Sequence, residues 1–236
     1  MIIFIKLLLA HLLGDFLLQP NSWVADKERR KHRSIYLYAH TLLHGIIAWM
    51  IIGTIEFGWY ALLLTVAHGI IDLLKLQLQK ESTKRAWFLL DQLLHVMVLG
   101  LITILYNDTT LKISDIDQHV WVIITSVVLL TSPSSILIKT VISIWTPNQN
   151  DTKEDLQNAG KYIGILERLF VFCFIVIGQF SAIGFLMAAK SIFRFGDLTQ
   201  AKDRKLTEYV LIGTLLSFGI AILTGLLAKH LLSITI

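Results

Sequence analysis

The chain has 236 residues, of which 55% are hydrophobic and 16% are charged, and its apolar residues gather in long runs. These proportions exclude an ordinary soluble domain and indicate an integral membrane protein. The net charge of +4 does not indicate a nucleic-acid partner, because Lys and Arg lie between the apolar runs, where membrane orientation explains them. The single cysteine, Cys173, excludes an internal disulfide.

The apolar runs predict an all-α fold, a polytopic membrane helical bundle. About 20 residues are needed to cross the hydrocarbon of a bilayer. The first run lacks a convincing cleavage site, so we interpret it as a transmembrane helix and not as a secretory signal. The fifth run is expected to kink or break at Pro133. In chain order, the runs lie at 2–19, 35–55, 59–79, 86–106, 119–145, 160–193 and 208–230.

The run 160–193 is either one long helix or a hairpin of two short helices. Basic residues concentrate in loops 20–34, 80–85 and 194–207. These three loops fall on one side of the membrane only if 160–193 is a hairpin, and cytoplasmic loops are enriched in Lys and Arg. We therefore predict about eight transmembrane segments, with seven as the alternative. The protein is expected in the bacterial inner membrane with both chain ends outside the cytoplasm; Lys6 argues mildly against this orientation.

Four consecutive predicted helices each carry a pair of metal-ligand residue types four positions apart. Residues at this spacing lie on one face of a helix, so each pair can point at the same small volume. The helical rise places one member of each pair roughly 6–11 Å from the cytoplasmic end and the other roughly 12–17 Å from it, which predicts two polar layers. The pairs are His11 and Asp15, His40 and His44, His68 and Asp72, and Asp91 and His95.

A faint internal repeat supports a shared site. His11-x3-Asp15 followed by "HTLLH" is echoed by His68-x3-Asp72 followed by "DQLLH", as if one helical hairpin were used twice. We accordingly divide the chain into an N-terminal four-helix half, 1–106, and a C-terminal set of helices, 107–236, within one membrane domain.

The cost of burying charge in a membrane supports a shared site for the paired residues. A carboxylate near the middle of a bilayer costs a few kcal/mol, so it normally faces the bundle interior and has a partner. Of the 17 acidic residues, only Asp15, Asp72, Asp91 and Glu167 fall well within apolar segments. The eight paired residues predict a divalent-metal site close to the cytoplasmic side. It would hold two ions, or one ion with further carboxylates orienting the histidines.

Imidazole and carboxylate donors suit zinc, which we favour, and also iron or manganese. A polar interhelical network or a proton relay would use the same residue types. Glu167 is a candidate extra ligand or general base, although pairing with Arg168 of another protomer, with Lys190 or with a backbone donor would equally explain it. Gln19 and Gln92 are candidate donors to the carboxylates, with interfacial hydrogen bonding as the alternative.

Several motifs together resemble a family of bacterial inner-membrane proteins of unassigned function. They are the start His11-x3-Asp15-Phe16-x2-Gln19, the later "DQLLH", and the C-terminal "GILERL", "AAKSIFRF" and "EYVLIGTLLSF". This resemblance implies no activity. The first four helices also resemble the membrane-bound metal-dependent hydrolases of bacteria, which carry His and Asp on successive helices.

The leading hypothesis is a metal-dependent hydrolase that acts on a lipid or lipid-linked small molecule near the cytoplasmic leaflet. Asp72 or Glu167 would take up the proton in this reaction. A non-haem di-iron lipid oxidase and a metal- or proton-coupled transporter remain open, as does a cluster that only fixes helix packing. The sequence names membrane lipids as partners and leaves the oligomeric state open.

Overall fold

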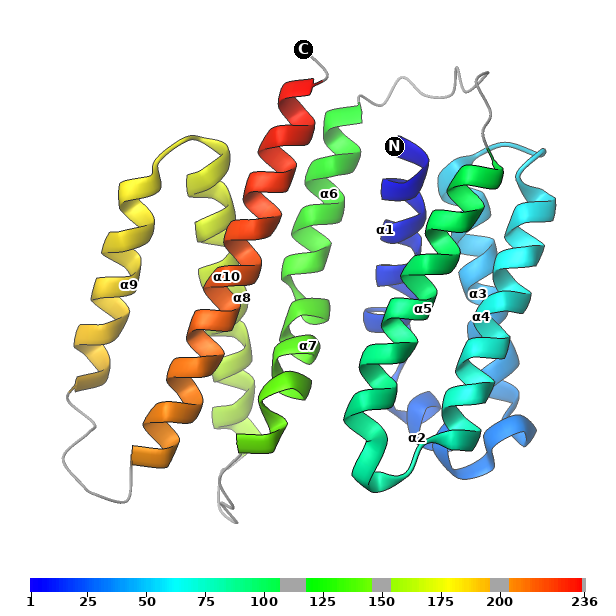
Figure 1. The fold of residues 1–236 in the computed structure, drawn as a ribbon, viewed down its shortest axis with the longest axis horizontal. Coiled ribbons are helices and arrows are strands. Elements are labelled where there is room, and N and C mark those ends of the chain that lie inside the picture. The colour runs from blue at the N-terminus through cyan, green and yellow to red at the C-terminus, as the bar shows by residue number, and fades with distance from the viewer. Residues whose placement is uncertain (107–117, 146–153, 196–203, 235–236) are drawn as a thin grey trace. The chain divides into compact units, whose positions relative to one another are not determined.

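The apolar runs fold into helices, and the described part of the chain contains no strand (Figure 1). The computed structural model describes residues 1–106, 118–145, 154–195 and 204–234. The expected all-α membrane architecture is confirmed. Among the described residues, five helical stretches are long and apolar enough to cross a membrane, or six if the first two helices count as one bent span. The five are Ile35–Ile52, Gly58–Leu78, Glu81–Leu105, Gln118–Trp145 and Glu208–Ser233.

The chain divides into two compact units, Met1–Thr125 and Ser126–Ile236. The first is built on four helices, each in contact with two neighbours, so that they form a closed ring in the order α1, α3, α4, α5. Short turns join α3 to α4 and α4 to α5, which makes these neighbours antiparallel. The helices are α1 (Ile2–Phe16), α3 (Ile35–Ile52), α4 (Gly58–Leu78) and α5 (Lys84–Leu105).

Helix α3 shows how residues are distributed between the inside and the outside of this bundle. His40 and His44 are buried, whereas Leu42, Trp49 and Met50 on the outer face are exposed. A helix on the surface of a water-soluble protein has the reverse arrangement, with polar residues outside and apolar residues inside. An apolar outer surface around polar residues fits a lipid environment, where buried polar groups face the bundle interior.

The half of the bundle nearest the N-terminus has an apolar core. It includes Leu7, Ile52, Phe57, Leu99 and Ile102, each at most 2% exposed. The first part of α6 (Gln118–Leu130) packs beside α1, since the Thr125 hydroxyl donates to the Ile5 carbonyl at 3.5 Å. The boundary between the two units therefore falls within α6, whereas the sequence-based division is placed before it, at 106/107.

The basic segment 20–34 forms a helix, α2 (Asn21–Arg30), and a single 3-10 turn, η1 (Lys31–Arg33). The expectation that this segment is a loop is therefore wrong. Its Ala, Lys, Glu and Arg residues are good helix formers, and Pro20 stands directly before it as the N-cap residue. Helices α1 and α2 meet at 79°. The 15 residues of α1 rise only about 22 Å, less than the thickness of the hydrocarbon.

The second unit contains the rest of α6 together with α7 (Ser132–Ile142), α8 (Glu154–Val176), α9 (Phe180–Phe195) and α10 (Arg204–Ile234). Helix α8 contacts α7, α9 and α10. The run 160–193 is thus two helices, as the hairpin prediction requires. Gly178, at φ +80°, ends α8 in a Schellman motif in which the Gln179 N–H donates to the Phe174 carbonyl at 2.7 Å.

The predicted break near Pro133 lies at Thr131, between α6 and α7. Pro133 has no N–H for the carbonyl four residues earlier, and the hydroxyl of Ser134 donates to that Leu129 carbonyl instead, at 2.6 Å. Arg168, which is 3% exposed, donates to the carbonyls of Leu130 and Thr131 at 2.7 and 3.1 Å. A buried guanidinium therefore supplies side-chain hydrogen bonds to two backbone carbonyls at the break in the helix, one of which, that of Thr131, also accepts from the Ser135 N–H at 3.3 Å.

Candidate metal centre

The structure brings all eight paired residues together inside the α1–α3–α4–α5 ring. Each helix supplies one pair, and the polar side chains meet at the end of the bundle where α2 crosses. The five histidines are 1–3% exposed, and the side chains of the three aspartates are 1–11% exposed. Because these polar side chains are buried, they need hydrogen-bond or ionic partners inside the bundle. The cluster consists of His11, Asp15, His40, His44, His68, Asp72, Asp91 and His95.

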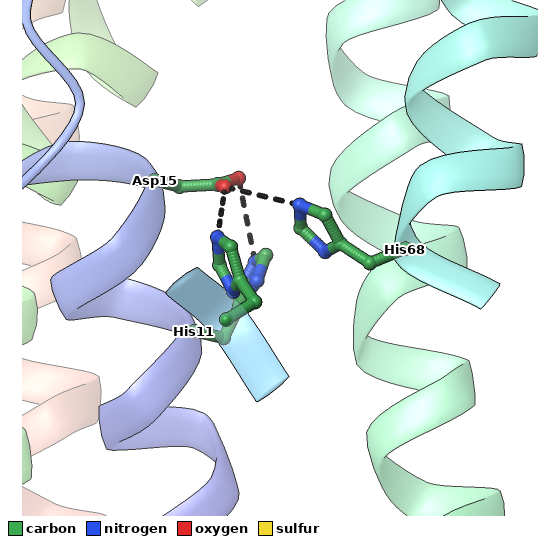
Figure 2. A group of neighbouring side chains, drawn as sticks. His11, Asp15 and His68 are labelled. Atoms are coloured by element: carbon green, nitrogen blue, oxygen red, sulfur yellow. Dashed lines mark hydrogen bonds and ion pairs between the residues drawn. The ribbon is translucent and has the colours of Figure 1, made fainter. Parts of the chain in front are cut away.

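Asp15 lies at the centre of the cluster, with imidazoles from three helices around its carboxylate (Figure 2). Its Oδ1 is 3.0 Å from Nε2 of His44 and 3.6 Å from Nε2 of His68. The Nε2 of His40 lies 3.2 Å from the same oxygen, and that of His11 lies 3.8 Å from Oδ2. Four imidazoles therefore direct the same ring nitrogen toward one carboxylate.

The imidazole rings are also close to one another. His68 stacks on His44 and on His95, with ring centroids 3.8 and 4.0 Å apart. The His11 ring is 5.5 Å from that of His44 and 5.1 Å from that of His95. His40 reaches the Nε2 of His68 at 3.2 Å and Asp72 at 3.7 Å. The two layers inferred from helical depth thus lie in direct contact, through Asp15 and His40.

These distances fit the donor spacing of a metal site. His11, Asp15, His44 and His68 can each offer one ligand atom within 4.8 Å of the others. Two tetrahedral ligands at about 2.0–2.1 Å from zinc are about 3.3 Å apart. The contacts of Asp15 with His44 and His68 through Oδ1, at 3.0 and 3.6 Å, and with His11 through Oδ2, at 3.8 Å, lie within about 0.5 Å of this value. The buried His and Asp groups could therefore hold a metal ion with small movements.

Two further groups overlap with the first. His40, His68 and Asp72 form one, and Asp15, Asp91 and His95 form the other. Both ring nitrogens of His95, the Oδ1 of Asp91 and the Nδ1 of His40 are buried, and they have no hydrogen-bond partner among the described residues. Unpaired buried polar atoms are costly, so these atoms are suited to receive a further group such as an ion or water.

Two lysines take part in the cluster, and the sequence reasoning missed both. Lys27 of α2 donates to the Oδ2 of Asp72 at 2.8 Å, and Lys75 donates to the Oδ2 of Asp91 at 2.9 Å. Lys75 stands three residues after Asp72 and hence near the same helix face, a spacing that could have identified it. Lys27 could not be identified this way, because it lies in a segment predicted to be a loop.

The two glutamines behave differently. Gln92 donates to Asp15 at 2.9 Å and to Asp91 at 3.2 Å, and its amide oxygen lies 3.3 Å from the Nε2 of His11. Gln92 is therefore a donor to the carboxylates. The side-chain nitrogen of Gln19 is buried and finds no hydrogen-bond partner in the described part of the chain.

Glu167, the other predicted catalytic candidate, belongs to the second unit. Its carboxylate accepts from Lys190 of α9, which is one of the alternatives that the sequence left open. Asp72 and Glu167 both remain predicted proton acceptors, but each already has a lysine partner.

The fold and the site define a class: an all-helical protein with apolar, membrane-length helices and a buried histidine–aspartate cluster in a four-helix ring. The chain belongs to the family described as "Protein of unknown function (DUF3307)", whose model matches residues 3–124. That range contains all eight cluster residues, Lys27, Lys75 and Gln92, whereas the C-terminal motifs lie beyond it. Comparison with curated proteins and with solved structures gave no match.

Proposed function

We propose that this protein is an intramembrane metalloenzyme, a metal-dependent hydrolase of a lipid or lipid-linked small molecule. The site would hold one or two divalent ions, with zinc favoured over iron or manganese. The observation that carries the proposal is the convergence of four imidazole nitrogens on Asp15, at 3.0–3.8 Å. Histidine and carboxylate donors from facing helices are an established way to hold metals in a bundle.

A bound divalent ion would supply a Lewis acid and a water nucleophile at neutral pH. The chain's own residues would then position the substrate and move a proton. Asp72 is the proposed proton acceptor, and Lys27 balances the charge of its carboxylate at 2.8 Å. Glu167 remains the alternative acceptor. Gln92 orients Asp15 and Asp91 through its amide, as partners of metal ligands commonly do.

The position of the cluster supports a substrate at the membrane surface. His40 stands five residues after the start of α3, about 8 Å along the helix axis. Basic residues surround this end of the bundle, which supports its proposed location at the cytoplasmic leaflet of the bacterial inner membrane. An ester or phosphoester near a lipid headgroup lies at a comparable depth.

The apolar core of the bundle favours an enzyme over a transporter. Beyond the cluster, the ring is filled by side chains such as Leu7, Ile52 and Leu99, which are packed to 2% exposure or less. A transported ion would need polar groups or water along that path, because an ion in an apolar interior is strongly unfavourable. The cluster is therefore better suited to chemistry at one end of the bundle than to passage through it.

The first test is elemental analysis of detergent-purified protein. Wild-type protein is expected to carry one or two equivalents of metal, which His44→Ala and Asp72→Ala should lose while still eluting as folded species. His230→Ala, which removes an exposed histidine of the second unit, is the matched control and should keep the metal. Wild-type protein that stays metal-free after incubation with zinc, iron and manganese would refute the metal site.

Hydrolysis is tested separately from metal binding. Metal-loaded protein in nanodiscs of defined phospholipids is expected to release products that a chelator abolishes and that His44→Ala does not form. Products would be identified by mass spectrometry. Oxidised lipid together with bound iron would point to the di-iron alternative, and metal binding without any lipid product would refute the hydrolase while leaving the metal site in place.

A further inference from the structure

The end of the first unit where α2 crosses carries an unusual share of the protein's charge. We call residues 17–34 and 79–85 the basic end. It contains eight Lys or Arg residues and three acidic ones, a balance of about +5, while the whole chain carries +4. The turn at the opposite end, 53–57, carries one acidic residue, Glu56, and no basic one. This asymmetry gives the basic end a positive potential that attracts anions.

The segments of the basic end lie together in space. Lys84, at the start of α5, pairs with Glu28 of α2, with its Nζ 2.8 Å from a carboxylate oxygen. Asp26 accepts from Arg29 and Arg30 at 3.4 and 3.0 Å. These internal pairs use both acidic residues of the helix.

Several cations remain after these pairs are formed. Lys31 and Arg33 are exposed, and no carboxylate lies within ion-pair distance of either one in the described part of the chain. The Nε of Arg85 is buried and lacks a hydrogen-bond partner among the described residues. A ligand with several negatively charged oxygens could occupy such groups together.

This surface carries aromatic and apolar side chains of the kind that gather at a membrane interface. Trp23 of α2 stacks on Tyr36 of α3, with ring centroids 5.2 Å apart. The exposed residues Leu18 and Ile35 flank the segment at either side, 49% and 72% exposed. Helices that lie in the headgroup region combine Lys and Arg with Trp and Leu in this way, and aromatic rings gather at that level. The bend of 79° between α1 and α2 fits such a helix.

We propose that the basic end is a binding surface for the headgroup of an anionic phospholipid. Charge complementarity identifies the ligand. An anionic phospholipid such as phosphatidylglycerol carries a negative phosphate and no cationic group in its headgroup, so its charge matches that of the unpaired Lys31 and Arg33. Helix α2 connects this surface to the cluster through Lys27, whose Nζ lies 2.8 Å from Asp72. In so far as it rests on the proposed function, this inference identifies the hydrolase substrate as an anionic lipid. The binding itself does not require a bound metal.

The test is lipid retention measured by native mass spectrometry of the full chain. Purified protein is mixed with phosphatidylglycerol or phosphatidylcholine of identical acyl chains, and bound lipid is counted. Wild-type protein is expected to retain phosphatidylglycerol preferentially. The double variant Lys31→Gln/Arg33→Gln should lose about 30-fold in affinity, since each basic residue near a surface contributes about five-fold. Lys139→Gln/Lys161→Gln, which removes two exposed lysines of the second unit, is the charge-matched control and should retain it.

Two results would overturn the inference: equal retention of both lipids by the wild type, or undiminished phosphatidylglycerol binding by the Lys31→Gln/Arg33→Gln variant. Metal content is read on the same samples. Selective lipid binding by protein that stays metal-free after incubation with zinc, iron and manganese would uphold this inference and refute the metal site. Bound metal without lipid preference would refute this inference and leave the metal site in place.

Discussion

Replacing Gly14 by alanine should displace His44 from the cluster and weaken metal binding. A methyl carbon at Gly14 would lie 2.4 Å from Cε1 and Nε2 of His44, whereas ordinary contact begins at 3.4 Å, so the ring must retreat by about 1 Å. Sites tolerate displacements of about 0.5 Å, so a loss of 10- to 100-fold in metal affinity is expected. Overpacking should also cost about 1–3 kcal/mol of stability.

The matched control is Gly100→Ala on α5. A methyl carbon there meets no atom within 4 Å, so the substitution tests helix propensity alone. It should stabilise the protein by up to about 1 kcal/mol and leave the metal in place. Metal titration and thermal unfolding in detergent measure both quantities. The reasoning fails if Gly14→Ala binds metal as tightly as Gly100→Ala does.

Three further predictions concern groups outside the histidine layer. Lys27→Met should destabilise the protein by about 3–5 kcal/mol in thermal unfolding, because it leaves the buried carboxylate of Asp72 without its partner; an unchanged melting temperature would contradict this. Arg168→Lys should cost about 2 kcal/mol or more, because a lysine keeps the charge but loses the planar fork that reaches two carbonyls, and equal stability of the two proteins would refute that role. The Ser34 hydroxyl, donating at 2.7 Å, lowers the pKa of Asp26 from its usual 3.8, with further help from Arg30 and Arg29. A carboxyl group whose pKa is lower in the folded than in the unfolded protein stabilises the fold when the pH is above its unfolded pKa. The wild type should therefore melt at a higher temperature than Ser34→Ala at neutral pH, and this difference should disappear as the pH falls below about 4. A difference independent of pH would contradict this.

The sequence was sufficient to predict the long apolar helices and the convergence of the polar faces of α1, α3, α4 and α5. A helix repeats its face every three to four residues, so a pair such as His40 and His44 must project to the same side, and a buried carboxylate such as Asp15 must find the interior. The direction of each helix follows because successive membrane spans cross the bilayer in alternating directions. Local periodicity and the cost of burying charge were the only information required.

The partners that depend on breaks between helices could not be predicted. Lys27 reaches Asp72 only because α1 ends after 15 residues and α2 turns by 79°, and neither feature follows from apolar periodicity. The role of Arg168 could not be predicted from its neighbours in the sequence. That role depends on how α8 packs against the break at Thr131, where the guanidinium reaches two carbonyls, and this is a tertiary property.

Charge balance connects the proposed metal site with the proposed lipid surface. Three aspartates and two lysines give the cluster a charge of about −1 when its histidines are neutral. Lys27 and Lys75 each neutralise one carboxylate, so Asp15 alone of the three aspartates has no lysine partner within the described part of the chain. A divalent ion there would leave the centre with a positive charge, which is costly in a membrane unless an anion accompanies it. An anionic headgroup held by the basic end would supply that charge, so metal and anionic lipid should each strengthen the binding of the other.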